Sequence, residues 1–141
     1  MITSIIKIAL SISASPLDVC AVIAYETHGT FSTSIRSPIG AVGLIQFTED
    51  TAESLGTTTD KLSTLSFEEQ SKYVIKYFKQ RKVKMHYDGK DLKRIYSSIF
   101  CGNIGYERCS RLSDDYNHWD EAYKEVLNYR IKCVKLFKAN V

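Results

Sequence analysis

One glutamate stands on a helical face whose other residues are apolar. Val19, Val22, Ile23 and Glu26 share one stripe of the segment PLDVCAVIAYE, residues 16–26. Burial among apolar neighbours disfavours the ionised form of a carboxyl group and therefore raises its pKa. The negative end of the helix dipole acts in the same direction. A carboxyl group that stays protonated near neutral pH can serve as a general acid, for example in cleaving a glycosidic bond.

The alternatives for Glu26 are structural. The side chain could extend into solvent, or it could form an ion pair with Arg36 in the loop that follows. The residues after Glu26 favour the catalytic interpretation, because they form a pattern that neither alternative explains.

That pattern runs through two quoted stretches. Glu26 lies in YETHGTF, and SPIGAVGLIQFTEDTAESLG follows at residues 37–56. Together they resemble the soluble lytic transglycosylase family, whose pattern has Glu-Ser, a short loop ending in an aromatic residue, Ser-x-x-Gly-Ala-x-Gly-Leu-Met-Gln and a Thr-x-x-Thr-Ala helix. The match is dense over residues 15–56 and looser over residues 66–105. This combination is far more specific than a lone glutamate.

The resemblance implies a fold and an activity. Members of the family have a mostly α, lysozyme-like fold related to goose-type lysozyme, and we expect one such domain over residues 1–141. They cleave the bond between N-acetylmuramic acid and N-acetylglucosamine in peptidoglycan. Glu26 matches the family's catalytic acid/base, and Thr27 replaces the usual Ser while keeping a hydroxyl.

The resemblance also implies a sugar groove beside Glu26. The residues that match its lining are Ser37, Gly43, Leu44, Ile45 and Gln46. A glycine permits close approach of the backbone to a ligand, and the Gln46 amide offers a donor and an acceptor to an acetamido or hydroxyl group. Simple loop geometry is the alternative explanation for these residues.

The sequence departs from the family pattern further along the chain. SSIFCGNIG, residues 97–105, takes the place of the family's Ala-Tyr-Asn-Ala-Gly motif, with Phe100 where a groove tyrosine is expected. The hydrogen bond of that tyrosine is therefore missing at Phe100. Tyr96, Asn103 and Tyr106 are the candidates to replace it.

One carboxylate suffices for the implied reaction. Glu26 would protonate the leaving oxygen while the substrate's own 2-acetamido group stabilises C1, and Glu26 would then remove a proton from the C6 hydroxyl. The product is a 1,6-anhydro sugar; attack by water instead would make the enzyme a hydrolytic lysozyme. The nearby acids Glu49, Asp50 and Glu53 suit the first turn of a helix. No metal or cofactor is expected.

Two other classes of protein fit the sequence less well. A catalytically silent wall-binding or phage-structural protein would keep the fold and groove, but Glu26 and Gln46 are intact. A nucleic-acid binder would suit the net charge of +3, but no helix carries interleaved basic residues for recognition. We therefore expect a monomer that binds peptidoglycan glycan strands and no nucleic acid. A protein inhibitor and delivery machinery are further partners to consider.

Composition and local signals predict a mostly α domain. The 141 residues are 44% hydrophobic and 25% charged, as in ordinary globular proteins. Expected helices are those that begin after Ser15, Thr48 and Ser66, a further helix that begins at Asp91, and a final one over residues 119–138. The stretches expected to form loops are residues 29–43 and 102–118, and GLIQF could form a short extended piece.

The first sixteen residues, MITSIIKIALSISASP, need a separate interpretation. Their apolar run is too short for a membrane span and is interrupted by Lys7. A signal peptide would begin with basic residues. The stripe of Ile5, Ile8, Ala9 and Ile12 favours a folded helix. Action in the periplasm or cell wall would then require delivery by phage, secretion or conjugation machinery.

Four cysteines complete the candidate residues. Cys20, Cys101, Cys109 and Cys133 show no CxxC spacing, which disfavours a structural zinc site. We expect free thiols, with Cys20 in the core. A Cys101–Cys109 or Cys109–Cys133 disulfide would require an oxidising compartment.

Overall fold

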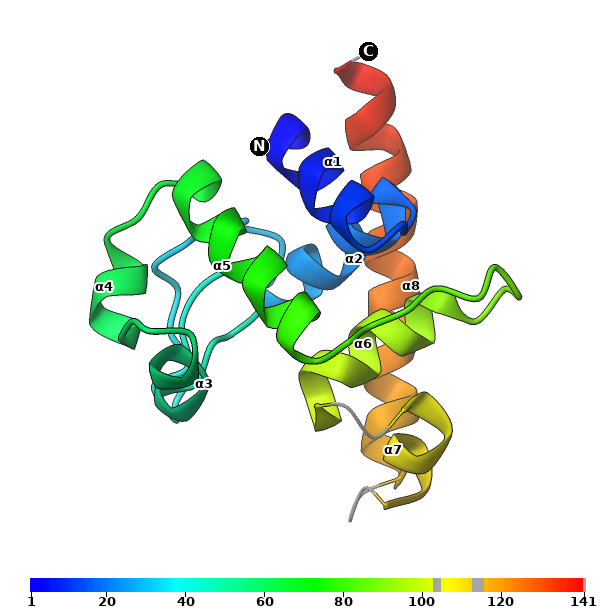
Figure 1. Cartoon of the computed structure of the whole chain (residues 1–141). Helices are drawn as coiled ribbons and strands as arrows, with labels where there is room; N and C mark the ends of the chain where they lie inside the picture. The colour runs from blue at the N-terminus through cyan, green and yellow to red at the C-terminus, as the bar shows by residue number, and fades with distance from the viewer. Residues whose placement is uncertain (103–104, 113–115, 141) are drawn as a thin grey trace.

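The computed structural model describes residues 1–102, 105–112 and 116–140, and their regular structure is helical (Figure 1). The helices are α1 (Ile2–Ser11), α2 (Pro16–Glu26), α3 (Glu49–Ser54), α4 (Thr59–Ser63), α5 (Phe67–Gln80), α6 (Asp91–Cys101), α7 (Tyr106–Leu112) and α8 (Tyr116–Ala139). In these ranges β pairing is limited to isolated bridges of Val42 with Arg36 and Phe47. The predicted mostly α fold is confirmed.

Helix α2 forms the centre of the molecule. Its start follows the predicted signals: the Ser15 Oγ accepts a hydrogen bond from the Leu17 backbone N at 3.2 Å, and Pro16 occupies the first helical position. All residues from Asp18 to Ala24 are buried, because α2 packs against α1, α6 and α8 (Figure 1). The helix ends at Glu26.

Helix α1 is part of the folded core, as predicted. Ile5, Ile8 and Ala9 are fully buried, and the helix contacts both α2 and α5. The Tyr87 hydroxyl also donates a hydrogen bond to the Ser13 carbonyl oxygen at 2.9 Å. Among the helices described, none is by itself long and apolar enough to cross a membrane.

A polar side chain holds the loop after α2 against α5. Gln70 is completely buried; its Oε1 accepts a hydrogen bond from the Leu44 backbone N, and its Nε2 donates to the carbonyls of Thr33 and Leu62. The predicted caps stand at both ends of this region, with Thr48 capping α3 and a complete capping box at Ser66. The sequence interpretation missed the short α4.

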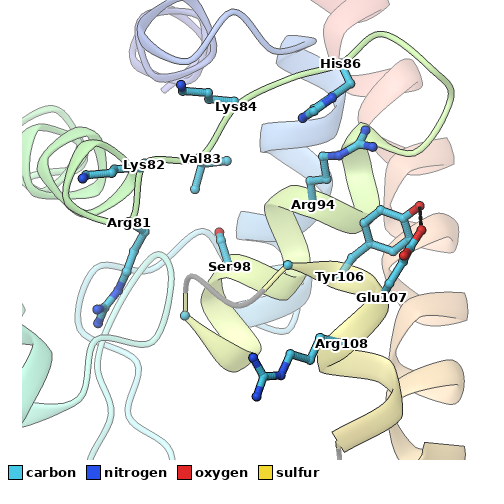
Figure 2. A pocket seen from close by; sticks show the side chains of 12 residues that line it. Arg81, Lys82, Val83, Lys84, His86, Arg94, Ser98, Tyr106, Glu107 and Arg108 are labelled. Atoms are coloured by element: carbon cyan, nitrogen blue, oxygen red, sulfur yellow. Dashed lines mark hydrogen bonds between the residues drawn. The ribbon is translucent and has the colours of Figure 1, made fainter.

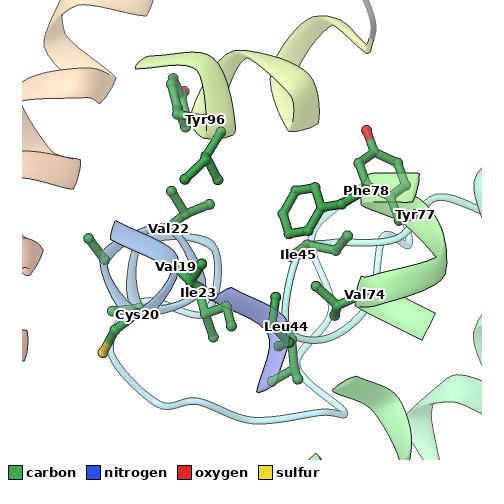
Figure 3. Close-up of a cluster of buried hydrophobic side chains, with 14 of the residues drawn as sticks. Val19, Cys20, Val22, Ile23, Leu44, Ile45, Val74, Tyr77, Phe78 and Tyr96 are labelled. Atoms are coloured by element: carbon green, nitrogen blue, oxygen red, sulfur yellow. The ribbon is translucent and has the colours of Figure 1, made fainter. Parts of the chain in front are cut away.

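The apolar core lies between α2, the loop and α5. Val22 and Ile23 of α2 lie opposite Leu44 and Ile45 of the loop, and Phe78 of α5 closes the cluster (Figure 3). All five side chains are 3% exposed or less. This packing fixes the direction in which α2 ends, and hence the position of Glu26.

The predicted loop over residues 102–118 is wrong. Helix α7 occupies Tyr106–Leu112, and α8 begins at Tyr116, three residues before the expected start. Cys109 and Trp119 are buried, so tertiary packing stabilises helices in a stretch whose polar composition suggested a loop.

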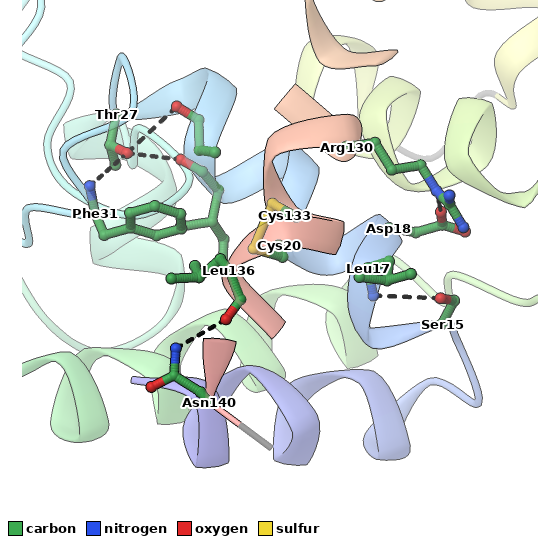
Figure 4. Close-up of a disulfide and its surroundings, with 12 residues drawn as sticks. Ser15, Leu17, Asp18, Cys20, Thr27, Phe31, Arg130, Cys133, Leu136 and Asn140 are labelled. Atoms are coloured by element: carbon green, nitrogen blue, oxygen red, sulfur yellow. Dashed lines mark hydrogen bonds and ion pairs between the residues drawn. A yellow bond between two sulfur atoms is a disulfide. The ribbon is translucent and has the colours of Figure 1, made fainter. Parts of the chain in front are cut away.

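The prediction of free thiols is also wrong. Cys20–Cys133 joins α2 to α8 (Figure 4). Cys101–Cys109 joins α6 to α7, which leaves no free cysteine. The Cys101–Cys109 alternative is thereby confirmed and Cys109–Cys133 is excluded. Cys20 and Cys133 are separated by 113 residues, so only the packing of α2 against α8 reveals that they face each other.

Candidate active site

Glu26 is the last residue of α2, where the helix meets the loop. Its side chain is partly exposed, but the surrounding protein desolvates the carboxyl group and raises its pKa from 4.5 to about 8. Within the described part of the chain, it makes no hydrogen bond and no ion pair. A carboxyl group with this pKa is protonated at neutral pH and ready to donate a proton.

The alternative pairing of Glu26 with Arg36 is wrong. The Arg36 guanidinium instead contacts Asp60 Oδ1 at 2.8 Å and the Gly40 carbonyl oxygen at 3.1 Å. The solvent-facing alternative is also disfavoured, because a freely hydrated carboxyl group would keep its ordinary pKa.

Three tyrosines contribute to the surroundings of Glu26. The rings of Tyr25 and Tyr96 meet edge to face, 5.6 Å apart. The Tyr77 hydroxyl donates to the Ser98 carbonyl oxygen at 2.6 Å. Burial is the main cause of a raised pKa in all three, and the nearby charge of Glu26 contributes in each. Helices α2, α5 and α6 each supply one of these neutral aromatic groups, and burial of the Glu26 carboxyl group favours its uncharged form.

Thr27, the predicted neighbour of the catalytic residue, has its hydroxyl occupied by the backbone. The Thr27 Oγ1 donates to the Ile23 carbonyl oxygen at 2.8 Å and accepts from the Phe31 N at 2.9 Å (Figure 4). Its side chain is fully buried. It therefore closes the helix end and fixes the direction of the loop, which positions Glu26.

The predicted groove residues largely build the loop itself. The Ser37 Oγ accepts a hydrogen bond from the Ala41 N at 3.2 Å. A Cβ at Gly43 would lie in severe conflict with the Gln70 amide, so this glycine serves internal packing. Leu44 and Ile45 are buried in the core, and the Leu44 backbone N donates to the Gln70 Oε1.

Gln46 keeps one polar atom for a ligand. Its Nε2 donates to the carbonyl oxygens of Ile35 at 3.2 Å and Gly43 at 3.1 Å. Its Oε1 accepts no hydrogen bond from the described residues, and the side chain is partly exposed. An amide oxygen held in this way can accept a hydrogen bond from a sugar hydroxyl or acetamido group.

The three candidates for the missing groove tyrosine differ in position. Tyr96 is 1% exposed and electrostatically coupled to Glu26. Tyr106 instead lines a separate cavity, where its hydroxyl donates to Glu107 Oε1 at 3.1 Å. Asn103 lies outside the described residues. Of the two described candidates, Tyr96 is the one placed beside Glu26.

That separate cavity was not anticipated. It has a volume of about 510 Å³ and lies between the segment after α5, helix α6 and the start of α7 (Figure 2). Arg81, Lys82, Lys84, Arg94 and Arg108 line it, and Glu107 is the one acidic residue among the described residues of the lining. The run QRKVKMH, residues 80–86, was the available sequence signal.

The arrangement around Glu26 suits proton transfer by a single carboxyl group. No group of three or more His, Cys, Asp or Glu side chains capable of holding a metal ion occurs in the described ranges. Comparison of the chain with protein-family models, curated proteins and solved structures gives no match.

Proposed function

We propose that this protein cleaves the β-1,4 bond between N-acetylmuramic acid and N-acetylglucosamine in peptidoglycan, on a lysozyme-like fold. The observation that carries the proposal is the Glu26 carboxyl group, which pairs with no described residue and whose pKa is raised to about 8 at the end of a buried helix. The sequence pattern around it supports the choice of substrate.

The reaction needs only Glu26 and the substrate. The protonated carboxyl group donates its proton to the glycosidic oxygen as the bond from C1 to that oxygen breaks, and the 2-acetamido group stabilises C1. The Glu26 carboxylate then accepts the proton of the C6 hydroxyl while the C6 oxygen bonds to C1. Glu26 is protonated again at the end, and the product is a 1,6-anhydro sugar.

The acidic residues that follow Glu26 most closely in the sequence are poor candidates for a second catalytic carboxylate. The Glu49 Oε2 accepts hydrogen bonds from the backbone N and hydroxyl of Thr59, which lower the pKa of this carboxyl group. Asp50 and Glu53 are exposed on α3. Enzymes that hydrolyse with inversion or through a glycosyl-enzyme use two carboxylates. The intramolecular 1,6-anhydro route is therefore favoured over hydrolysis.

The two disulfides support action outside the reducing cytosol. Disulfides persist in oxidising compartments such as the bacterial periplasm, which is also where peptidoglycan is reached. We further propose that the enzyme is a monomer and that phage, secretion or conjugation machinery delivers it to the cell wall.

Digestion of purified sacculi tests the proposal. We expect soluble muropeptides whose mass is lower by one water than that of the hydrolytic products, as shown by chromatography with mass spectrometry. Muropeptides with only reducing-end muramic acid would identify a hydrolytic lysozyme. Binding to sacculi without release of muropeptides would instead indicate a silent wall-binding protein.

A further inference from the structure

Among the described residues, the lining of the cavity beside α7 has more basic than acidic side chains. Arg94 is neutralised, because its guanidinium contacts Asp88 and Asp91 at 2.6 and 2.9 Å. The other four basic residues of the lining form no ion pair with a described residue: Arg81, Lys82, Lys84 and Arg108. Figure 2 shows these side chains arising from the segment after α5 and from α7, on different sides of the cavity.

Arg81 brings a guanidinium group to the lining of this cavity. The guanidinium lies 5.0 Å from the centre of the Tyr77 ring, and the residue is partly exposed. A guanidinium is well suited to bind a carboxylate with two hydrogen bonds.

Tyr77 is linked both to the cavity and to the candidate active site. The Tyr77 hydroxyl donates a hydrogen bond to the carbonyl oxygen of Ser98, which lines the cavity. The charges of both Arg81 and Glu26 act on the pKa of Tyr77. Arg81 of the cavity and Glu26 therefore lie within electrostatic range of the same tyrosine.

We propose that this cavity binds the carboxylates of the peptide stem that peptidoglycan carries on its muramic acid. The inference rests on the proposed function, which supplies a substrate with several carboxylates on a short peptide. A volume of about 510 Å³ lies within the range of small-ligand sites. The Tyr106 ring and Val83 add apolar surface for the stem, so the cavity selects strands that carry peptides over denuded ones.

The Cys101–Cys109 disulfide holds the two sides of this cavity together. Cys101 ends α6, which contributes Ser98, and Cys109 directly follows Arg108 on α7. The test therefore uses the oxidised full-length chain.

Isothermal titration calorimetry with the free tripeptide L-Ala–γ-D-Glu–diaminopimelate tests the inference without any cleavage. We expect binding to the wild type, and a Kd weakened by about tenfold or more in Arg81→Gln and in Arg108→Gln. Arg108 is exposed, so its variant guards against a folding defect at Arg81. Lys124→Gln, which removes an exposed charge on α8 outside the cavity, should bind like the wild type.

Three outcomes would overturn the inference. These are equal affinity for the tripeptide and its carboxyl-amidated form, an unchanged Kd in both arginine variants, and binding of glycerol phosphate without binding of the tripeptide. The proposed function fails separately, if sacculi are not cleaved while the tripeptide still binds. Cleavage of stem-bearing and denuded strands at the same kcat/KM would also contradict the selection of stems.

Discussion

At the scale of single residues, the position of Glu26 is unfavourable for a charged carboxylate but suitable for a general acid. Desolvation destabilises its ionised form, and the end of α2 is an unfavourable place for a negative charge. No cation among the described residues offsets either effect through an ion pair. A group that lowers stability and has no structural partner is a strong candidate for function.

The first prediction concerns Glu26→Gln. The amide keeps the size of the side chain but cannot donate an acidic proton, so cleavage of sacculi should fall by about 10²–10⁴-fold. The Tm should stay the same or rise slightly, because the variant removes an ionisable group from a desolvated position. Glu53→Gln, on the exposed side of α3, is the matched control and should keep full activity. An active Glu26→Gln protein with a lower Tm would rule out the catalytic assignment.

The second prediction concerns the two tyrosines. Tyr96→Phe should lower kcat on sacculi, because Tyr96 is the described candidate beside Glu26. Tyr106→Phe should leave kcat unchanged, because Tyr106 lines the basic cavity and its hydroxyl bonds to Glu107. Equal kcat values in Tyr96→Phe and the wild type would remove Tyr96 from the active site.

The third prediction concerns Gln46→Ala, which removes the free amide oxygen. We expect a higher KM on polymeric peptidoglycan. Because the Gln46 Nε2 also donates to two loop carbonyl groups, a small decrease in Tm is expected as well. Wild-type kinetics on the polymer would show that Gln46 makes no contact with the substrate.

At the scale of elements, the Cys20–Cys133 disulfide clamps the central pair of helices. The same pair is joined by Asp18 and Arg130, whose charged atoms lie 2.7 Å apart (Figure 4). Both links lie toward the start and middle of α2, so they hold the helix while leaving the end with Glu26 open to the loop.

The fourth prediction compares the two disulfides. In the chain-entropy model, a crosslink across 113 residues contributes about 4–5 kcal/mol to the free energy of unfolding, and one across 8 residues about 2–3 kcal/mol. Cys20→Ser/Cys133→Ser should therefore lower the Tm more than Cys101→Ser/Cys109→Ser, as measured by calorimetry. A larger loss in the second variant would show that α7 contributes more to stability than the chain-entropy model allows.

The helices could be predicted where local signals were strong. Ser15-Pro16, Thr48 and the capping box at Ser66 encode helix starts in the residues themselves. Helix α7 has no comparable local signal. It is stabilised instead by the disulfide to α6 and by the burial of Cys109. Such long-range contacts are invisible in a local pattern.

The candidate site likewise has features that the local sequence predicts and features that depend on long-range contacts. The pattern on α2 indicated a desolvated Glu26, and the structure confirms its raised pKa. The spacing of residues 37–46 could not show that Gly43 and Leu44 pack against Gln70, a residue 26 positions beyond Leu44. The basic cavity was missed because its cations lie on three segments that only the fold brings together: the segment after α5, α6 and α7.

At the scale of the whole molecule, the free energy of unfolding should depend on pH, because folding shifts the pKa values of different carboxyl groups in opposite directions. The pKa of Asp88 is lowered mainly by its contact with Arg94, and the pKa of Asp91 mainly by hydrogen bonds from the backbone of His86 and Tyr87. The contribution of both groups to stability is lost as the pH falls. The pKa of Glu26 is raised, so its effect has the opposite sign. Subtracting the Glu26→Gln variant from the wild type isolates the Glu26 effect, because the aspartates are common to both proteins.

The fifth prediction uses that difference. Between pH 4.5 and about 8, the unfolded chain has ionised Glu26 while the folded chain retains the proton. The folded state then binds more protons, and its stability falls as the pH rises. Relative to Glu26→Gln, the wild type should lose free energy of unfolding progressively across this interval and show no further change above it. Urea denaturation of both proteins at a series of pH values measures the difference.

The same titration should govern catalysis. The first step needs the protonated form of Glu26, so kcat/KM on soluble glycan fragments should fall as the pH rises through about 8. Two measurements should then report the same group in the free enzyme. One is the pKa at which kcat/KM falls, and the other is the pH above which the difference in free energy of unfolding stops changing. Activity lost near pH 4.5 instead, with a stability difference that does not vary with pH, would mean that Glu26 is ionised in the folded protein. Its role as the general acid would then be untenable, because the proton would already have left before the substrate binds.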